Sequence, residues 1–233
     1  MKTYKTEALI VSIGLIVFGY FVFKGLGDFS KGARIVSVKG LAEIEVPADK
    51  VTWPLVFKNV GNSLSTLHTN IIKKNQTIVK FLKEEGVIDS EISIGAPDVI
   101  DLSANRYNNE PIPHRYNVTS VLTVTSNDVK KIRRLILRQS ELLKQGIAIT
   151  GEDYRYRTNY SFTKLNEIKP KMIEEATENA RAAAIKFAED SESKLGKIRR
   201  ANQGQFSISD RDNNTPYIKV VRVVTTIDYF LED

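Results

Sequence analysis

The chain contains no cysteine and only two histidines among its 233 residues. The absence of cysteine excludes disulfide bonds, thiolate metal sites and a cysteine nucleophile. The sequence has no phosphate-binding P-loop and no G-x-S-x-G turn, and its GLGDFS stretch lacks the last glycine of a dinucleotide-binding motif. His68 and His114 have no histidine or cysteine partner nearby in the sequence, which disfavours a zinc site. We therefore predict no catalytic, cofactor-binding or metal-binding residue.

The overall composition is that of a globular protein. Hydrophobic residues make up 42% of the chain and charged residues 27%. The formal net charge is +6, but lysine and arginine are distributed along the chain with acidic residues between them. The excess of positive charge therefore indicates solubility first and a polyanionic partner second.

One long apolar stretch is present, ALIVSIGLIVFGYFVF at residues 8–23, and it carries no charge. With Lys24 reaching back to the headgroups, a helix over residues 8–27 would be about 30 Å long, which matches a bilayer core. We expect a transmembrane signal-anchor helix at 8–27, a short cytoplasmic segment at 1–7 and a tether at 28–33. Lys2 and Lys5 favour an N-terminus inside the cell and an exported body. A cleaved secretory signal is the alternative, although the segment after the apolar run offers no good A-x-A cleavage site.

The remainder of the chain alternates between strand-like and helix-like patterns. Helical spacing covers residues 63–85, 128–146 and 169–196, and extended patterns cover 34–60, 91–102, 114–126, 146–162, 197–209 and 217–231. This order predicts an α+β fold, a mixed and largely antiparallel sheet with about three helices packed on one face. No internal boundary is evident, so residues 34–233 are expected to form one exported domain.

Local signals mark the ends of the predicted helices. Asn62 or Ser63 is expected to cap the first helix, with Gly86 just past its end. Asn127 and Asp128 open the second helix, and Pro170 suits the first turn of the third. Pro54 predicts an edge or a bulge in its strand. The expected apolar helix faces are Leu64, Leu67, Ile71, Ile78 and Leu82 in the first helix, Val129, Ile132, Ile136 and Leu143 in the second, and Ile173, Ala176, Ala180, Ala183, Ala184 and Phe187 in the third.

Three carboxylates, Glu43, Glu45 and Asp49, lie close together in the stretch GLAEIEVPADKV. On a strand, Glu43 and Glu45 share one face, while Ile44 and Val46 share the other. This is the pattern of a half-buried strand with its acids in water, and Asp49 after Pro47 fits a turn. We therefore favour a solvated strand face over a metal or acid/base site, which would need more oxygen ligands.

Two basic stretches are candidates for binding. KKIRRLILR, residues 130–138, places Lys130, Lys131, Arg133, Arg134 and Arg138 around a helix that is apolar on its other side. A solvated helix face explains this pattern, and binding of anionic lipid or an acidic partner is the alternative. YRYR, residues 154–157, resembles aromatic–basic sequences that bind single-stranded nucleic acid, but a strand with tyrosines on one face and arginines on the other explains it equally well.

A family resemblance is carried by an ordered series of segments. After the apolar helix come VSVKGLAEIEVPADKV, KEEGVIDSEIS, YNVTSVLTVTSNDVKKI and ENARAAAIKFAEDSESKLGKI. This series resembles the SIMPL-domain family of bacterial exported proteins, which includes the periplasmic immunogenic proteins, over residues 34–231. Ser193 and Lys194 depart from it, since they occupy the place of a small apolar pair. The resemblance implies a periplasmic or membrane-tethered α+β domain that tends to self-associate, with a suggested role in envelope or oxidative-stress tolerance. The family has no agreed activity and supplies no catalytic residues.

The sequence thus predicts a non-catalytic envelope protein that is anchored in the inner membrane by residues 8–27, with its C-terminal domain in the periplasm. We expect a homo-oligomer formed along the strand edge at 217–230, a possible envelope protein partner and no nucleic acid. One alternative is a hydrolase-like enzyme in which His68 or His114 meets a serine and a carboxylate only in the folded state. Another is a periplasmic ligand-binding module with an apolar cavity between helices and sheet.

Overall fold

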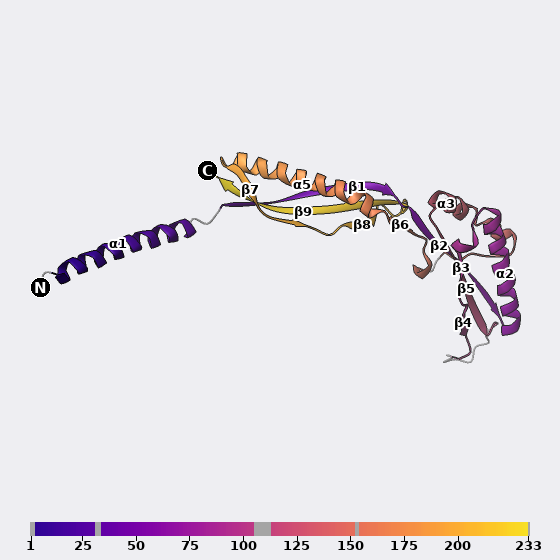
Figure 1. Ribbon diagram of the computed structural model, residues 1–233. Helices are drawn as coiled ribbons and strands as arrows, with labels where there is room; N and C mark the ends of the chain where they lie inside the picture. The colour runs from indigo at the N-terminus through magenta and orange to yellow at the C-terminus, as the bar shows by residue number, and fades with distance from the viewer. Residues whose placement is uncertain (1–2, 31–33, 105–112, 152–153, 233) are drawn as a thin grey trace. The chain divides into compact units, whose positions relative to one another are not determined.

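The computed structural model describes residues 3–30, 34–104, 113–151 and 154–232 (Figure 1). The first element is a single helix, α1 (Thr3–Ser30). Between Glu7 and Lys24 it is apolar, and none of this segment is buried against the rest of the protein. The helix has the length and composition of a membrane anchor or a signal sequence. It runs past the predicted end at residue 27, so residues 28–30 of the expected tether are helical.

The α+β class predicted from the sequence is confirmed, but the strands form two antiparallel sheets where a single sheet was expected. In the first sheet the strand order is β1-β9-β7, and β8 also pairs with β9. In the second the order is β3-β5-β2-β6, and β4 also pairs with β5. The strands are β1 (Ile35–Pro47), β2 (Lys50–Gly61), β3 (Ile92–Ile94), β4 (Asp98–Asp101), β5 (Tyr116–Ser126), β6 (Asn159–Ser161), β7 (Lys194–Gln203), β8 (Ser207–Asp210) and β9 (Ile218–Glu232).

The chain divides into two compact units, and both are built from segments far apart in the sequence. The first unit comprises Met1–Ala42, Ile173–Gln205 and Val223–Asp233, and the second comprises Glu43–Met172 and Phe206–Arg222. Because the chain enters and leaves each unit more than once, no single linker separates them. This explains why the sequence shows no boundary, and whether residues 34–233 act as one domain stays a prediction.

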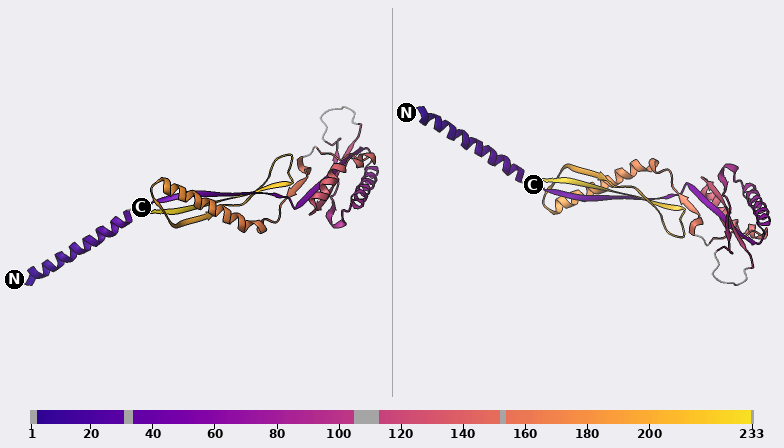
Figure 2. Two further views of the ribbon diagram at one scale, coloured as in Figure 1. Left: turned by 90° about the horizontal axis from the view of Figure 1, so that it is seen from above. Right: turned by 90° about the horizontal axis from the view of Figure 1, so that it is seen from below.

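The core of the first unit forms where α5 (Leu165–Asp190) lies along one face of the first sheet (Figures 1 and 2). The predicted alanines at 176, 180 and 184 are fully buried there, and Val38 of β1 packs against the last two. Gly40 of β1 makes the closest approach. A methyl group at Gly40 would overlap the carbonyl oxygen of Ala176 and would lie 2.9 Å from the Cβ of Ala180. The side chain of Asn179 donates a hydrogen bond of 2.8 Å to the Leu41 carbonyl, which fixes the helix on the strand.

The limits and the buried face of α5 differ from the prediction. The helix begins at Leu165, so Pro170 lies inside it and not in its first turn. It ends at Asp190, not at Gly196, because Glu192 adopts a left-handed conformation with φ 54°. The N–H groups of Glu192 and Ser193 then bond back to the carbonyls of Glu189 and Ala188, which closes the helix. Phe187, which was expected in the core, is 59% exposed, and Ala188 and Met172 are buried instead.

In the second unit, helices α2 (Leu64–Glu84) and α3 (Val129–Arg138) pack against the second sheet. The predicted start and end of α2 are confirmed: Ser63 accepts a hydrogen bond from the Thr66 N–H, and Gly86 follows the helix with φ +82°. In the second sheet, β2 and β5 form the longest ladder, which is antiparallel from the pair Val51–Ser126 to the pair Gly61–Tyr116 and has no bulge. β6 pairs with β2 only at residues 50–52, so Pro54 lies past the end of that pairing. Among the described residues, β2 is paired at Pro54 only with β5, and Pro54 therefore lies at an edge and not at a bulge.

Two predicted elements of the second unit are divided in the structure. The helix expected over 128–146 breaks at residues 139–140 into α3 and α4 (Glu141–Lys144). The break shifts the helical phase, so Leu143 is 58% exposed and Leu142 is fully buried. The strand expected over 91–102 forms β3 and β4, both paired with β5, with the segment 95–97 between them and the short 3₁₀ turn Asp89–Glu91 before them.

The C-terminal strand β9 is an inner strand. β1 lies along one side of it, and β7 and β8 pair with its other side, at residues 225–232 and 219–222 respectively. The backbone N–H and C=O groups on both sides of β9 are therefore available to neighbouring strands of its own sheet. The prediction that residues 217–230 offer a free edge for assembly is wrong, because β7 and β8 cover one side of β9 and the distant strand β1 covers the other.

A tight turn precedes β9 and is organised by Asp212. Its carboxylate accepts hydrogen bonds of 2.8 Å from the N–H groups of Asn214 and Thr215 and also binds the Thr215 hydroxyl and the guanidinium of Arg211. The hydrogen bond from Thr215, followed by that from Arg211, lowers the pKa of Asp212 to about 2. Arg211 also forms an ion pair of 3.3 Å with Glu45 of β1.

The packing at Gly40 predicts a large effect of a small substitution. Gly40→Ala is expected to lower the free energy of unfolding of the full-length protein by about 3 kcal/mol, because the backbone of α5 must move. Urea titration in a non-ionic detergent, followed by circular dichroism, measures this change. Gly151→Ala is the control, since nothing lies within 4 Å of a methyl group there. Equal stability of the two variants would contradict the close packing.

The Asp212 turn predicts a dependence on pH. Since the folded-state pKa lies below the ordinary value of 3.8, the turn is fully stabilised above about pH 4 and loses this stabilisation as the pH falls towards 2. The amide resonances of Asn214 and Thr215 are expected to titrate together with a midpoint near 2. In Asp212→Asn this titration is expected to disappear. A midpoint near 3.8 in the unmodified protein would show that the carboxylate does not hold the turn.

Candidate binding grooves

A basic groove lies in the second unit between α3 and the turn that precedes β9. α3 is strongly amphipathic: Ile132 and Leu135 are buried in the core, which turns Lys130, Arg133 and Arg134 away from it. The Asp128 carboxylate caps the helix by accepting a hydrogen bond of 2.9 Å from the Lys131 N–H. We define the basic groove as two adjoining hollows, of about 900 and 680 Å³, that share the side chains Lys130, Arg133 and Tyr217.

An aromatic stack orients the central arginine of this groove. The guanidinium carbon of Arg133 lies 3.3 Å from the ring centroid of Tyr217, which is close enough for face-to-face stacking. Tyr217 in turn meets the buried ring of Tyr160 edge to face, with 6.2 Å between the ring centroids. Burial raises the pKa of the Tyr160 phenol, and the positive charge of Arg133 opposes this shift. The stack therefore extends from the core to the floor of the groove.

The five basic residues of residues 130–138 divide into two groups. Lys131 lies 3.6 Å from Glu91 and donates to the Gly86 carbonyl, and Arg138 pairs with Glu85 and Glu141. These two contacts attach α3 to its neighbours. For Lys130, Arg133 and Arg134, by contrast, the described residues place no carboxylate within 4.0 Å. The positive charge of these three side chains is therefore left for a ligand.

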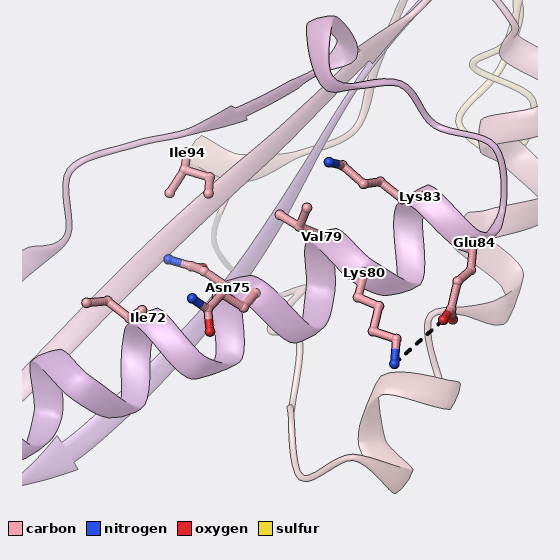
Figure 3. Close-up of a pocket in the computed structure, with 8 residues that line it drawn as sticks. Ile72, Asn75, Val79, Lys80, Lys83, Glu84 and Ile94 are labelled. Carbon is pink, nitrogen blue, oxygen red and sulfur yellow. Dashed lines mark ion pairs between the residues drawn. The ribbon is translucent and has the colours of Figure 1, made fainter.

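A second hollow, of about 650 Å³, lies between α2 and the edge strand β3, and we call it the α2 groove. Ile72, Val79 and Ile94 face a common space, as Figure 3 shows. Asn75, which is buried, hydrogen-bonds to Ser120 beneath it. The ion pair between Lys80 and Glu84 lies on another side of the helix (Figure 3). The surface exposed in the groove is largely apolar, although Lys80, Lys83 and Glu84 also line it, and Ile94 is 51% exposed.

The acidic residues of the strand after α1 do not form a site. Glu43 and Glu45 are exposed on one face of β1, as predicted. Val46 is buried on the other face, but Ile44, which was also expected there, is 37% exposed. Glu45 pairs with Arg211, whereas Asp49 accepts hydrogen bonds from the N–H groups of Thr163 and Lys164 just before α5. Within the described ranges, no group of three or more histidine, aspartate or glutamate side chains is arranged to hold a metal ion.

The other candidates from the sequence also lie apart. His68 is exposed on α2, His114 is exposed just before β5, and neither lines the basic groove or the α2 groove. The expected strand at YRYR is wrong, because Tyr154–Tyr156 form a 3₁₀ turn. In that turn the Arg155 guanidinium lies over the Tyr156 ring at 5.5 Å from its centroid.

Some residues of the two grooves were missed by the sequence analysis. Tyr160 and Tyr217 are separated by a long helix and two strands, and no local pattern links them to Arg133. For the α2 groove a signal was available. Ile72 and Val79 each follow a residue of the predicted apolar stripe by one position, which widens that stripe beyond what core packing needs.

Chemically, the basic groove offers cations, aromatic surface and amide groups, which favour non-covalent binding of an anionic ligand. Among the described residues, its lining contains neither serine nor histidine and a single acid, Asp128, which caps α3. General acid/base and nucleophilic catalysis would need a base within hydrogen-bonding reach of a nucleophile. The α2 groove offers a largely apolar surface with two side-chain amides, Asn75 and Gln76, and charged side chains from Lys80, Lys83 and Glu84.

Comparison with known proteins identifies the family. A protein of Oncorhynchus mykiss, named interleukin-1 receptor-associated kinase 1-binding protein 1 homolog, is 23% identical over 156 residues. The match covers 67% of this chain, and the chain spans 59% of the length of that relative. The sequence profile of the SIMPL family, described as a protein of unknown function (DUF541), matches residues 36–223. Since this match covers most of the chain and agrees with the resemblance found in the sequence, the protein belongs to the SIMPL family.

Proposed function

We propose that this protein is a membrane-anchored binding protein of the cell envelope that acts by association and not by catalysis. The observation that carries the proposal is α1, whose stretch at residues 8–23 is apolar and uncharged and is not buried against the described part of the chain. Burial of such a helix in a bilayer is strongly favourable, whereas its exposure to water is costly. The helix holds the domain at the inner membrane, and the domain lies in the periplasm.

The two grooves support a binding role. The basic groove presents oriented cations without a nucleophile and base, so it suits recognition better than turnover. The name of the trout relative states that it binds a receptor-associated kinase, and a role in protein binding agrees with this. An envelope protein partner, and a contribution to envelope or oxidative-stress tolerance, belong to the same proposal.

Self-association is also part of the proposal, through a different surface from that expected. Because β9 is flanked on both sides, the outer strands β1 and β7 provide the open edges of the first sheet. Such edges pair with strands of another chain unless charges or bulges prevent it. β7 carries two register shifts against β9, which disfavour its regular pairing and leave β1 as the better edge.

A second candidate function is the binding of a small apolar ligand, and the α2 groove is the observation that favours it. Its volume of about 650 Å³ lies within the range of small-molecule sites, and its apolar lining with few amides is typical of them. Such a ligand would lie against Ile72, Val79 and Ile94.

Membrane anchoring predicts the behaviour of a charged variant. The full-length protein is expected to stay with the membrane pellet after alkaline extraction. The double variant Leu15→Lys, Phe18→Lys is expected to be released, because each lysine at the centre of a spanning helix costs about 3 kcal/mol. Leu15→Ile, Phe18→Leu is the matched control and should remain in the pellet. A mature protein that begins near residue 32 and is soluble would refute the anchor and favour a cleaved signal.

The α2 groove predicts a selective loss of dye binding. Ile94→Glu is expected to weaken the binding of an apolar fluorescent dye by roughly tenfold, because a charge then lines an apolar site. Ile88→Glu is the control, since Ile88 is also an exposed isoleucine, at 61%, but lies outside the groove. Dye titration by fluorescence makes the comparison, and identical affinities in the two variants would exclude this site.

A further inference from the structure

We propose that the basic groove binds an extended acidic segment of a partner protein, with carboxylate side chains held by Arg133, Arg134 and Lys130. This inference rests on the proposed function and adds to it the chemistry of the partner. It is drawn from three observations: the orientation of Arg133, the charge left without a partner, and the shape of the groove.

Stacking prepares Arg133 for a carboxylate. Its guanidinium carbon lies 3.3 Å from the centroid of the Tyr217 ring, a distance that suits parallel stacking. In a parallel stack the N–H groups at the edge of the guanidinium point sideways from the ring and not into it. A guanidinium edge matches the two oxygens of a carboxylate, which it binds with two parallel hydrogen bonds. Because the stack already restricts the side chain, less conformational entropy is lost on binding.

The neighbouring charges continue this site along α3. Lys130 lines both hollows of the groove and Arg134 lines the larger one. The single acid of the lining, Asp128, is engaged with the Lys131 N–H at the start of the helix. Lys131 and Arg138 are neutralised by Glu91, Glu85 and Glu141, so the positive charge is concentrated at the groove and not spread over the helix.

The shape of the groove favours a polypeptide over a small anion or a membrane surface. Two hollows of about 900 and 680 Å³ meet at the Arg133–Tyr217 pair, so a ligand that crosses this pair occupies both. A free phosphate would fill only a small part of one hollow. A bilayer surface is flat and would not enter a concave site.

Polar and apolar groups at the rim suit a peptide chain. The side-chain amides of Asn213 and Asn214 line the larger hollow and can bond to peptide carbonyl and N–H groups. Leu137, which is 82% exposed, and Pro216 provide apolar contacts beside the cations. The groove therefore fits a segment in which acidic and apolar side chains alternate.

The test uses the full-length protein in a non-ionic detergent and a short fluorescein-labelled peptide of alternating glutamate and leucine. Fluorescence anisotropy is expected to show saturable binding, and Arg133→Gln, Arg134→Gln is expected to weaken it about 100-fold, since each charge-assisted contact contributes about a factor of ten. The matched control Lys73→Gln, Lys144→Gln removes the same charge from exposed lysines of the same unit outside the groove and should change the affinity by less than about threefold.

A second pair of variants separates orientation from net charge. Tyr217→Leu keeps every charge but removes the stack, and it is expected to weaken binding about tenfold, whereas Tyr217→Phe keeps the ring and should bind as the unmodified protein does. Circular dichroism establishes that each variant is folded. If Tyr217→Leu binds like the unmodified protein and the lysine control weakens binding as much as the arginine variant does, the binding reflects net charge and the inference fails.

Other ligands provide the remaining outcomes. Inorganic phosphate that abolishes peptide binding at low concentration would assign the groove to a small anion. Binding to detergent micelles that contain phosphatidylglycerol, lost in the arginine variant while the peptide does not bind, would assign it to a lipid surface. Both results would overturn the inference. Failure of the peptide to bind leaves the membrane extraction result unchanged, so a failure here is distinguishable from a failure of the proposed function.

Discussion

The contact between Gly40 and α5 is the constraint on which the first unit depends. Backbone meets backbone there, because glycine on the strand and alanines on the helix leave no side chain between them. Packing at this distance gains many dispersion contacts per residue, but it tolerates no added methyl group. It also gives a physical reason for the glycine in the VKGLAEI stretch that links this chain to the SIMPL family. The alanine stripe and the glycine are two halves of one interface.

A second interface, between α3 and the turn before β9, has a different character. Here tyrosines and an arginine meet in place of alanines and a glycine, and one side of the arrangement remains open to solvent. The buried ring of Tyr160 supports Tyr217, and Tyr217 supports Arg133. A charged group that is held in place in this way gains specificity for planar acidic groups, because its binding orientation is set before the ligand arrives.

These two features suggest how the protein divides its tasks. α1 has the length and composition of a membrane anchor or a signal sequence, and the alanine–glycine interface gives the first unit a compact core. The second unit contains the grooves, and the acidic side chains Glu45 and Asp49 serve the fold. Asp49 joins distant segments, and Glu45 pairs with the turn that carries Tyr217 through Arg211. Two of the carboxylates that first suggest chemistry thus hold parts of the fold together, including the turn beside the basic groove.

The sequence by itself determined the features that depend on neighbouring residues. The cap at Ser63, the left-handed Gly86, the capping Asp128 and the alanine stripe of α5 follow from local hydrogen bonding and from periodicity. The tertiary structure alone decided which strands flank β9, which of Leu142 and Leu143 is buried, and that Arg133 meets Tyr217 and Tyr160. Each of these depends on contacts between residues far apart in the chain, and the residue pattern of a short segment does not specify which distant segments pack against it. Local order was therefore readable from the sequence, whereas the binding groove exists only in the folded chain.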